Sequence, residues 1–377
     1  MIEGIDVAQL QSFFIILAQE INTPPLMKIL KYLVFLILLI IIGGAIYFGT
    51  KDGSYVVQET ITIPSPAEVV FDKVNDYKSW ESWITWKQEN PNMIFNYAEK
   101  TSGEGASFSW EGKNSGSITT TKLIPNKEIL QDVVFDSPTG TSEAAMSWNF
   151  ESEGDSTTVR WETRGEHSLM DKVYYAINDS GLTEKIQKLN EESLKNISQE
   201  VVADMKKYSI NVDGVTQFGG GYYMYTTSVA KQQEVDGKAT SMMKLVQGFV
   251  SDNNLNISGD PFILYNETDT INNTVIFSTG LPVKERVITP EGSPVVCGFM
   301  DSVSAVKVSL KGNYSHLPEA LLKGMKFIEK NSHQVDSGRK IFEVYIIDSN
   351  EEPNPAKWLT EVYIPIVTSD GLTETGL

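Results

Sequence analysis

Cysteine and histidine are scarce in this 377-residue chain, which contains one cysteine, Cys297, and three histidines. A single cysteine excludes an intrachain disulfide, so each domain must be stabilised by its own hydrophobic core. His167, His316 and His333 have no zinc-type spacing relative to one another or to Cys297. The sequence therefore predicts no metal site and no other cofactor.

Basic residues are few compared with acidic ones: 31 Lys and Arg stand against 49 Asp and Glu, a net charge of −18. Nucleic acids and anionic lipid surfaces are bound through basic faces, so this balance argues against both as partners of the main part of the chain. The overall composition, 41% hydrophobic and 21% charged, is ordinary for globular domains. We therefore expect the part of the chain after residue 53 to fold into two domains.

Long apolar runs are absent with one exception, the uncharged residues 32–50, which lie between Lys28 and Lys31 on one side and Lys51 on the other. At about 1.5 Å per residue a helix of this length covers about 28 Å, close to the hydrocarbon thickness of a bilayer. We predict a transmembrane anchor over residues 27–51; a buried helix in a soluble core is the alternative. No small-residue cleavage site follows the run, which favours an uncleaved anchor over a signal peptide.

The lysines before the apolar run predict the orientation of the anchor. Under the positive-inside rule the N-terminus is cytoplasmic and both domains lie outside the cytoplasm, as in a single-pass protein of a bacterial inner membrane. Met27 is favoured as the natural start, because Lys28 and Lys31 follow it directly. Residues 1–26 are then a short N-terminal segment, with an amphipathic helix over residues 7–21 as the alternative.

Residues 54–207 have the pattern of a first domain, in which a strand at 55–63 and a helix at 67–74 come first. Six segments of strand composition follow between turn residues, at 93–98, 106–110, 115–123, 128–135, 144–150 and 157–163. A stripe of apolar residues at helical spacing from Leu182 to Met205 then predicts one long helix. The expected order is strand, helix, a meander of strands, and a long final helix.

This order, with the run Asp76-Tyr-Lys-Ser-Trp80-Glu-Ser-Trp83-Ile-Thr-Trp86, resembles the START-like, polyketide-cyclase-like superfamily (SRPBCC). The resemblance implies the helix-grip fold, a curved antiparallel sheet holding the final helix around an apolar cavity for hydrophobic ligands. Core packing is the alternative role for large aromatic residues. The candidates to line the cavity are tryptophans: Trp80, Trp83, Trp86, Trp110, Trp148 and Trp161.

Residues 209–367 contain an internal repeat. Phe262-Ile-Leu-Tyr265 corresponds to Phe342-Glu-Val-Tyr345 eighty residues later, and each copy follows a segment with helical periodicity, at 239–250 and 317–329. Two copies of strand, helix, strand, strand predict a pseudo-two-fold module with both helices on one antiparallel sheet. The predicted fold class of the whole chain is α+β, with a polar tail at 368–377.

The second domain is also similar to a known family. Gly312-Asn-Tyr314, Phe342-Glu-Val-Tyr345 and the closing Thr360-Glu-Val-Tyr-Ile-Pro-Ile366 resemble the gyrase-inhibitory-protein-like (GyrI-like), or AraC-type effector-binding, family. This resemblance implies a cleft between the two halves that accepts lipophilic, often cationic compounds through aromatic walls and a buried glutamate. Some members of the family hydrolyse reactive natural products. No helix-turn-helix region accompanies the domain, so a DNA-bound regulator is not expected.

Two Glu-x-Tyr pairs are the main candidates for the ligand site. Residues two apart share a face of a strand, so Glu343 points with Tyr345 and Glu361 points with Tyr363. We expect the two pairs to form one acidic, aromatic patch, with Glu361 as the principal charge; a solvated sheet face is the alternative. Tyrosine rings supply cation–π surface for an amine. Tyr314 and Trp358 are further candidates.

Three functions follow from these observations. The main hypothesis is binding of a small lipophilic, in part cationic, molecule or lipid by a membrane-anchored protein. The first alternative is hydrolysis of a reactive lipophilic compound, with Glu361 and Tyr314 as the acid/base pair. The second is a protein-interaction module whose cavities are filled by its own side chains. The sequence does not indicate an oligomeric state or the identity of a ligand.

Overall fold

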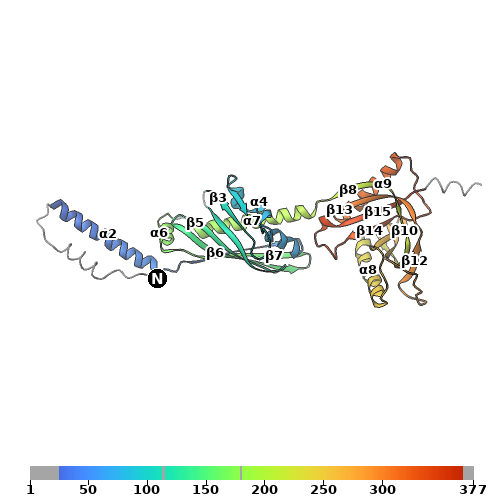
Figure 1. The fold of residues 1–377 in the computed structure, drawn as a ribbon, viewed down its shortest axis with the longest axis horizontal. Coiled ribbons are helices and arrows are strands. Elements are labelled where there is room, and N and C mark those ends of the chain that lie inside the picture. The colour runs from blue at the N-terminus through green and yellow to red at the C-terminus, as the bar shows by residue number, and fades with distance from the viewer. Residues whose placement is uncertain (1–24, 113–114, 179–180, 368–377) are drawn as a thin grey trace, which may run out of the picture.

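The computed structural model describes residues 25–112, 115–178 and 181–367. An apolar helix comes first, a seven-stranded sheet follows, and an eight-stranded sheet lies at the far end (Figure 1). The predicted α+β class is confirmed. The predictions for residues 1–24 and for the tail at 368–377 fall outside the described residues.

The apolar run forms α2 (Pro25–Gly49). Along Met27–Gly49 none of the most apolar window is buried against the rest of the chain, and the helix is long and apolar enough to cross a membrane. Its large side chains are exposed, Ile40 by 65% and Ile46 by 63%. A helix that is apolar all round and exposed among the described residues is not typical of a soluble core.

The first sheet is antiparallel throughout, and its strands lie in the order β1-β7-β6-β5-β4-β3-β2. Buried and exposed residues alternate along β7, as expected for a sheet with one covered face. The final helix, α7 (Leu182–Met205), packs on the sheet through Leu194, Ile197 and Val201. The predicted helix-grip arrangement is confirmed. The strands are β1 (Ser54–Ile63), β2 (Ile94–Tyr97), β3 (Ser107–Glu111), β4 (Gly116–Ile124), β5 (Glu128–Ser137), β6 (Gly140–Glu153) and β7 (Ser156–Glu166).

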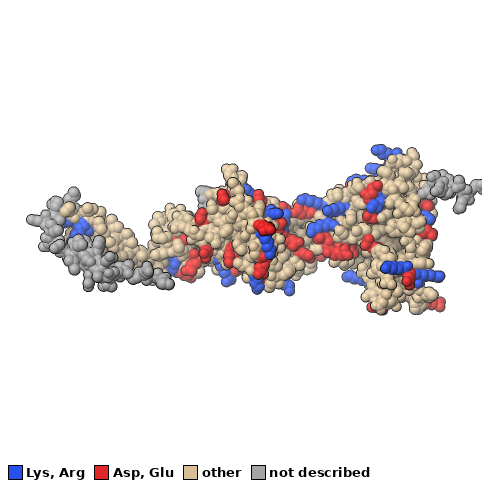
Figure 2. All heavy atoms as spheres, in the orientation of Figure 1, with Lys and Arg blue, Asp and Glu red and all other residues tan. Residues whose placement is uncertain are grey.

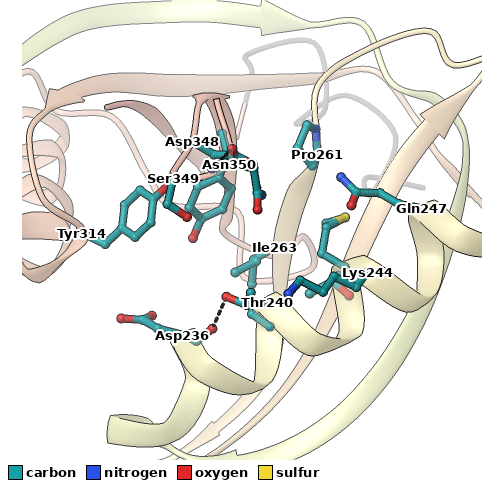
Figure 3. Close-up of a pocket in the computed structure, with 14 residues that line it drawn as sticks. Asp236, Thr240, Lys244, Gln247, Pro261, Ile263, Tyr314, Asp348, Ser349 and Asn350 are labelled. Atoms are coloured by element: carbon teal, nitrogen blue, oxygen red, sulfur yellow. Dashed lines mark hydrogen bonds between the residues drawn. The ribbon is translucent and has the colours of Figure 1, made fainter. Parts of the chain in front are cut away.

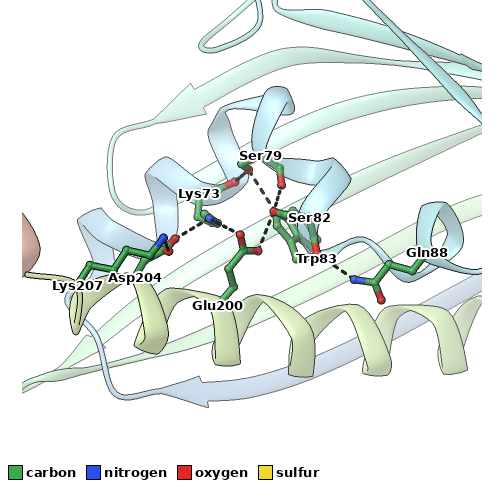
Figure 4. Close-up of polar contacts among 8 residues, drawn as sticks. All are labelled: Lys73, Ser79, Ser82, Trp83, Gln88, Glu200, Asp204 and Lys207. Carbon is green, nitrogen blue, oxygen red and sulfur yellow. Dashed lines mark hydrogen bonds and ion pairs between the residues drawn. The ribbon is translucent and has the colours of Figure 1, made fainter. Parts of the chain in front are cut away.

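Charged side chains hold α7 against the short helices that follow β1. Lys73, on α3 (Ala67–Asn75), lies 2.9 Å from both Glu200 and Asp204 of α7 (Figure 4). Ser82 donates a hydrogen bond of 2.8 Å to Glu200 from α4 (Trp80–Trp83). η1 (Tyr77–Ser79) links α3 to α4, and α5 (Thr85–Gln88) follows. These contacts tie the tryptophan-rich segment to the long helix.

A short helix that the sequence analysis did not predict, α6 (Leu169–Asn178), lies between β7 and α7. It contacts α2, at the end of the first domain nearest that helix (Figure 1). Ser168 caps it, with its hydroxyl 3.1 Å from the backbone nitrogen of Asp171, whose carboxylate accepts from the same hydroxyl at 2.7 Å.

The second sheet has the strand order β12-β9-β11-β10-β14-β15-β13-β8 and is antiparallel. α8 (Val235–Asp252) packs on β9 and β11, and α9 (Leu317–Lys330) packs on β13 and β15. The elements are β8 (Ser209–Phe218), β9 (Gly221–Lys231), η2 (Gln232–Glu234), β10 (Phe262–Asp269), β11 (Thr274–Val283), β12 (Val296–Met300), β13 (Val303–Lys311), η3 (Tyr314–His316), β14 (Phe342–Ile347), η4 (Pro355–Lys357) and β15 (Leu359–Pro365).

The strand order confirms the predicted pseudo-two-fold repeat. β9, α8, β10 and β11 match β13, α9, β14 and β15, and the two copies meet where β10 pairs with β14. Both copies have a bulge at the same place, after Tyr265 and after Tyr345. β8, which precedes the first half in the sequence, pairs with β13 of the second half.

Candidate functional site

Glu343 lies at the junction of the two halves, on the sheet face that carries α8 and α9. Its direct neighbours across the sheet are Ile263 on β10 and Val362 on β15. Directly opposed residues in antiparallel strands share a face, so these three side chains point the same way, into the apolar layer beneath the helices. Only 7% of Glu343 is exposed. A carboxylate in such a place requires hydrogen-bond donors or a cation.

Two tyrosine hydroxyls supply the donors. Tyr265 and Tyr345 donate to the same oxygen of Glu343, Oε2, at 2.8 and 2.9 Å. The pKa of Glu343 is raised from 4.5 to about 7, chiefly by burial and in part by the carboxylate of Asp236, while the two hydroxyls act to lower it. Burial and the charge of Glu343 also raise the pKa of both tyrosines. Near neutral pH the carboxyl is therefore divided between its charged and neutral forms.

A cleft lined in part by Tyr345, one of the two donors to Glu343, opens between α8 and the segment that follows β14 (Figure 3). It is partly open to solvent and has a cavity volume of about 80 Å³. One wall is α8 and the other is formed by η3 and by the loop from Asp348 to Asn350, with β10 as the floor. The lining residues are Asp236, Ala239, Thr240, Met243, Lys244, Gln247, Pro261, Ile263, Thr279, Tyr314, Tyr345, Asp348, Ser349 and Asn350.

Aromatic rings form the side of the cleft nearest η3. The Tyr314 ring meets that of Tyr345 edge to face with centroids 5.1 Å apart, and it stacks on Trp358 with centroids 4.4 Å apart. The Trp358 indole nitrogen donates to the carbonyl of Glu352 at 2.7 Å, which fixes the ring. Burial and the nearby carboxylate of Asp348 raise the pKa of Tyr314, so its hydroxyl stays protonated at neutral pH.

The charges around the cleft are predominantly negative. Asp236 and Asp348 line it, Glu343 lies behind Tyr345, and Lys244 is the basic residue among the lining side chains. Burial raises the pKa of Asp236. A cavity with an excess of carboxylates and low-dielectric walls concentrates cations.

Two hydroxyls on the same face have no hydrogen-bond partner in the described part of the chain. Thr279, which lines the cleft, and Thr360, which lies opposite Tyr345 on β15, are fully buried and their Oγ1 atoms are unpaired. A buried hydroxyl without a partner costs about 1–3 kcal/mol. A ligand that offers a polar atom to Thr279 removes part of that cost.

The prediction that Glu343 and Glu361 share one patch is wrong. Glu361 lies opposite Val344 and Glu343 lies opposite Val362, so the two carboxylates project from opposite faces of the sheet. On its face Glu361 forms an ion pair of 2.8 Å with Lys307 and accepts a hydrogen bond of 2.6 Å from Tyr363. Of the two Glu-x-Tyr pairs, only Glu343 and Tyr345 belong to the cleft region.

The candidate residues of the first domain lie in its core. Trp80, Trp83 and Trp148 are fully buried and contact one another, with ring centroids 5.0 to 6.1 Å apart. Trp110 is 8% exposed and packs against Trp86. These contacts are those of a packed aromatic core. That these rings line a ligand cavity stays a prediction.

Some residues of the cleft were not identified from the sequence. Tyr265, which donates a hydrogen bond to Glu343, occupies the position in the first repeat that Tyr345 occupies eighty residues later in the second. That equivalence was the available signal for Tyr265. Asp236 and Thr279 carried no signal, because their place in the cleft depends on how α8 and β11 pack. Within residues 25–112, 115–178 and 181–367, no three His, Cys, Asp or Glu side chains converge as a metal site.

The fold is that of a duplicated α+β domain with a cleft between its halves. Residues 226–367 match the family model of the GyrI-like small molecule binding domain. Residues 64–192 match the model of Activator of Hsp90 ATPase homolog 1-like protein, an SRPBCC-like family. The chain therefore carries an SRPBCC-like domain followed by a GyrI-like small-molecule-binding domain, and both predicted resemblances are confirmed in that order.

Several solved structures are similar to parts of the chain. The EcmrR C-terminal domain is 16% identical, with a TM-score of 0.37, over 43% of this chain and 98% of that chain. EcmrR in its complex with DNA is 16% identical, with a TM-score of 0.35, over 54% and 85% of the two chains. Protein CV1439 from Chromobacterium violaceum is 14% identical, with a TM-score of 0.31, over 39% and 96%. No match was found among curated proteins.

Proposed function

We propose that this chain is a membrane-anchored binding protein whose GyrI-like domain captures a lipophilic cation in the cleft between α8 and the Asp348–Asn350 loop. The observation that carries the proposal is Glu343, a buried carboxylate held by two tyrosine hydroxyls next to an aromatic cleft. Burial disfavours its charged form, and a cation close by would favour that form again. The charged form of Glu343, which burial makes unfavourable in the free protein, would therefore attract and stabilise a bound cation.

The surroundings of Glu343 support a ligand that is both cationic and apolar. Tyr314 and Tyr345 line the cleft and pack edge to face, and the face of a tyrosine ring attracts a desolvated cation. Ile263, Ala239 and Met243 supply apolar surface in the same cleft. Such a mixture of apolar lining and a few polar groups is typical of small-molecule sites.

The placement in a membrane is part of the proposal. We propose that α2 crosses a bacterial inner membrane once, with Lys28 and Lys31 on the cytoplasmic side and the domains at 54–207 and 209–367 on the other. The length and apolarity of α2 and the exposure of its apolar side chains among the described residues support a membrane span. The test is protease accessibility of both domains in spheroplasts of cells that express the full chain.

The binding proposal is tested with two matched substitutions, Glu343→Gln and Glu361→Gln. Each removes one carboxylate from a Glu-x-Tyr pair, and the two residues lie on opposite faces of the sheet. Binding of tetraphenylphosphonium, a permanent cation, is measured at pH 8 by equilibrium dialysis of the full chain in nanodiscs, with empty nanodiscs as the blank. Loss of a charge-assisted contact is worth about 1.5–3 kcal/mol, so Glu343→Gln should weaken binding roughly 10- to 100-fold.

Glu361→Gln should leave the affinity within about twofold, because its partners Lys307 and Tyr363 lie on the far face. Equal losses of affinity in both variants would show that the cation does not bind through the charge of Glu343. An unchanged affinity in Glu343→Gln would overturn the proposed site.

Hydrolysis of a reactive lipophile is a second candidate, because a carboxyl with a pKa of about 7 beside a tyrosine suits general acid/base catalysis. The two functions predict different behaviour of Glu343→Gln. A hydrolase would lose turnover and keep its substrate, whereas a binding protein would lose cation affinity and show no turnover before or after the change. Product formation measured by mass spectrometry separates them.

A further inference from the structure

The helix α6 presents an unusual exposed surface at one end of the first domain. Met170, Tyr174 and Ile177 are 61%, 36% and 75% exposed. Their spacing of four and then three residues places them on one face of the helix, as an apolar stripe. The one acidic residue of α6, Asp171, is buried and faces the domain. The exposed side of the helix therefore carries no carboxylate, in a chain whose net charge is −18.

Polar contacts hold α6 firmly in this position. The Asp171 carboxylate accepts hydrogen bonds from Ser137 at 2.9 Å and from Thr139 at 2.5 Å, both at the turn between β5 and β6. These bonds lower the pKa of Asp171 against the opposing effect of burial, so the group stays charged at neutral pH. The apolar stripe is thus displayed by a fixed helix.

The same helix is tied to the chain that leaves α2. Lys172 donates to the carbonyl of Lys51 at 2.6 Å, and the backbone nitrogen of His167 donates to the carbonyl of Gly53 at 2.9 Å. Four residues, 50–53, separate α2 from β1 and span about 14 Å at most. The helix α6 therefore lies close to the end of α2 and to the solvent or lipid that surrounds it.

Aromatic residues complete this end of the domain. The His167 ring packs between those of Tyr55 and Tyr175, with centroids 4.8 and 5.1 Å away. In the view of Figure 2, the surface at the end of the first domain next to α2 is largely uncharged. Tyrosine and basic side chains around an apolar stripe are typical of a membrane–water interface.

We propose that α6 lies in the headgroup region of the bilayer that α2 crosses, with Met170, Tyr174 and Ile177 directed into the acyl boundary. The proposal rests on the insertion of α2, and it does not depend on which side of the membrane the domains occupy. The partner is the lipid surface itself, because the short link from residue 50 to residue 53 places α6 where α2 leaves the bilayer. A bilayer-docked α6 fixes the orientation of the first domain at the membrane.

The test places a fluorophore at single cysteines in the full chain, reconstituted in vesicles of phosphatidylcholine and phosphatidylglycerol. Cys297→Ser removes the natural thiol. Ile177→Cys reports on α6, Ile40→Cys on α2, and Ile271→Cys, in the turn between β10 and β11 and 92% exposed, is the control. All three isoleucines are exposed, so labelling disturbs no packing. Quenching by lipids brominated on their acyl chains measures the contact with the bilayer.

The expected result is strong quenching at residue 40, at least half as much at residue 177, and none at residue 271. Quenching at 40 with a value at 177 equal to that at 271 overturns the α6 proposal and leaves the anchor intact. Absence of quenching at 40 overturns the anchor and the α6 proposal together. A blue-shifted but unquenched probe at 177 would show that protein, such as a second copy of the chain, covers the stripe, and it also overturns the proposal.

Discussion

The affinity of the cleft for a permanent cation should depend strongly on pH. The pKa of Glu343 is raised by burial to about 7, so at pH 5 almost all of the free protein carries a proton on this group. A cation bound nearby favours the carboxylate, and binding at low pH must therefore release that proton. Affinity should fall as the pH is lowered through 7.

The size of the effect follows from the two protonation equilibria. A bound cation that restores the pKa to its ordinary 4.5 makes the affinity fall by about five- to sevenfold for each pH unit between 7 and 5. Between pH 8 and pH 5 the expected loss is about 70-fold. This corresponds to about 2.5 kcal/mol of binding free energy.

The assay is a series of tetraphenylphosphonium titrations from pH 5 to pH 8, because this cation does not itself titrate. Glu343→Gln is the control and should bind weakly with a flat pH profile. A wild-type affinity that is constant across this range, or an equal slope in Glu343→Gln, would refute the assignment of the charge to Glu343.

Three further predictions concern stability. The pKa of Glu343 is higher in the folded than in the unfolded chain, so the contribution of its protonated carboxyl to stability is complete below pH 4.5. That contribution, roughly 3 kcal/mol, is lost as the pH rises through about 7. Glu343→Gln should therefore resist urea better than wild type at pH 8 and equally well at pH 4. Trp148→Ala should cost about 3–5 kcal/mol in urea unfolding, because the ring is fully buried against Trp80 and Trp161. Gly220→Ala should lower the melting temperature by several degrees, since the glycine has a φ of +70° and an added Cβ would overlap the Met300 carbonyl oxygen; an unchanged value would contradict this.

Much of the fold could be predicted from the sequence because its signals are local. The uncharged run predicted α2, and the apolar stripe from Leu182 to Met205 predicted α7 with the same ends that the structure has. The repeat between residues 262–265 and 342–345 predicted the pseudo-symmetric sheet before any strand pairing was known. The short helix α6 was missed, although Gly165 near the end of β7 and the Ser168-x-x-Asp171 capping pattern were signals for its start.

The site could be predicted only in part, because it depends on the pairing between strands. The sequence shows that Glu343 points with Tyr345 and that Glu361 points with Tyr363, but it does not show how β14 aligns with β15. A shift of one residue in that alignment moves a side chain to the other face of the sheet. The observed alignment places Val362, and not Glu361, beside Glu343. The choice between the two glutamates therefore required the structure.

The pairing of Ile263 with Glu343 has a consequence for how such a site can arise. These two positions are equivalent in the repeat, eighty residues apart, and they face each other where the halves meet. A dimer of identical single repeats would place the same residue at both positions: two glutamates would repel each other, and two isoleucines would offer no charge. Two halves that differ in sequence, as in this chain, can place one carboxylate on the axis. The single carboxylate at this junction thus depends on the sequence difference between the two halves.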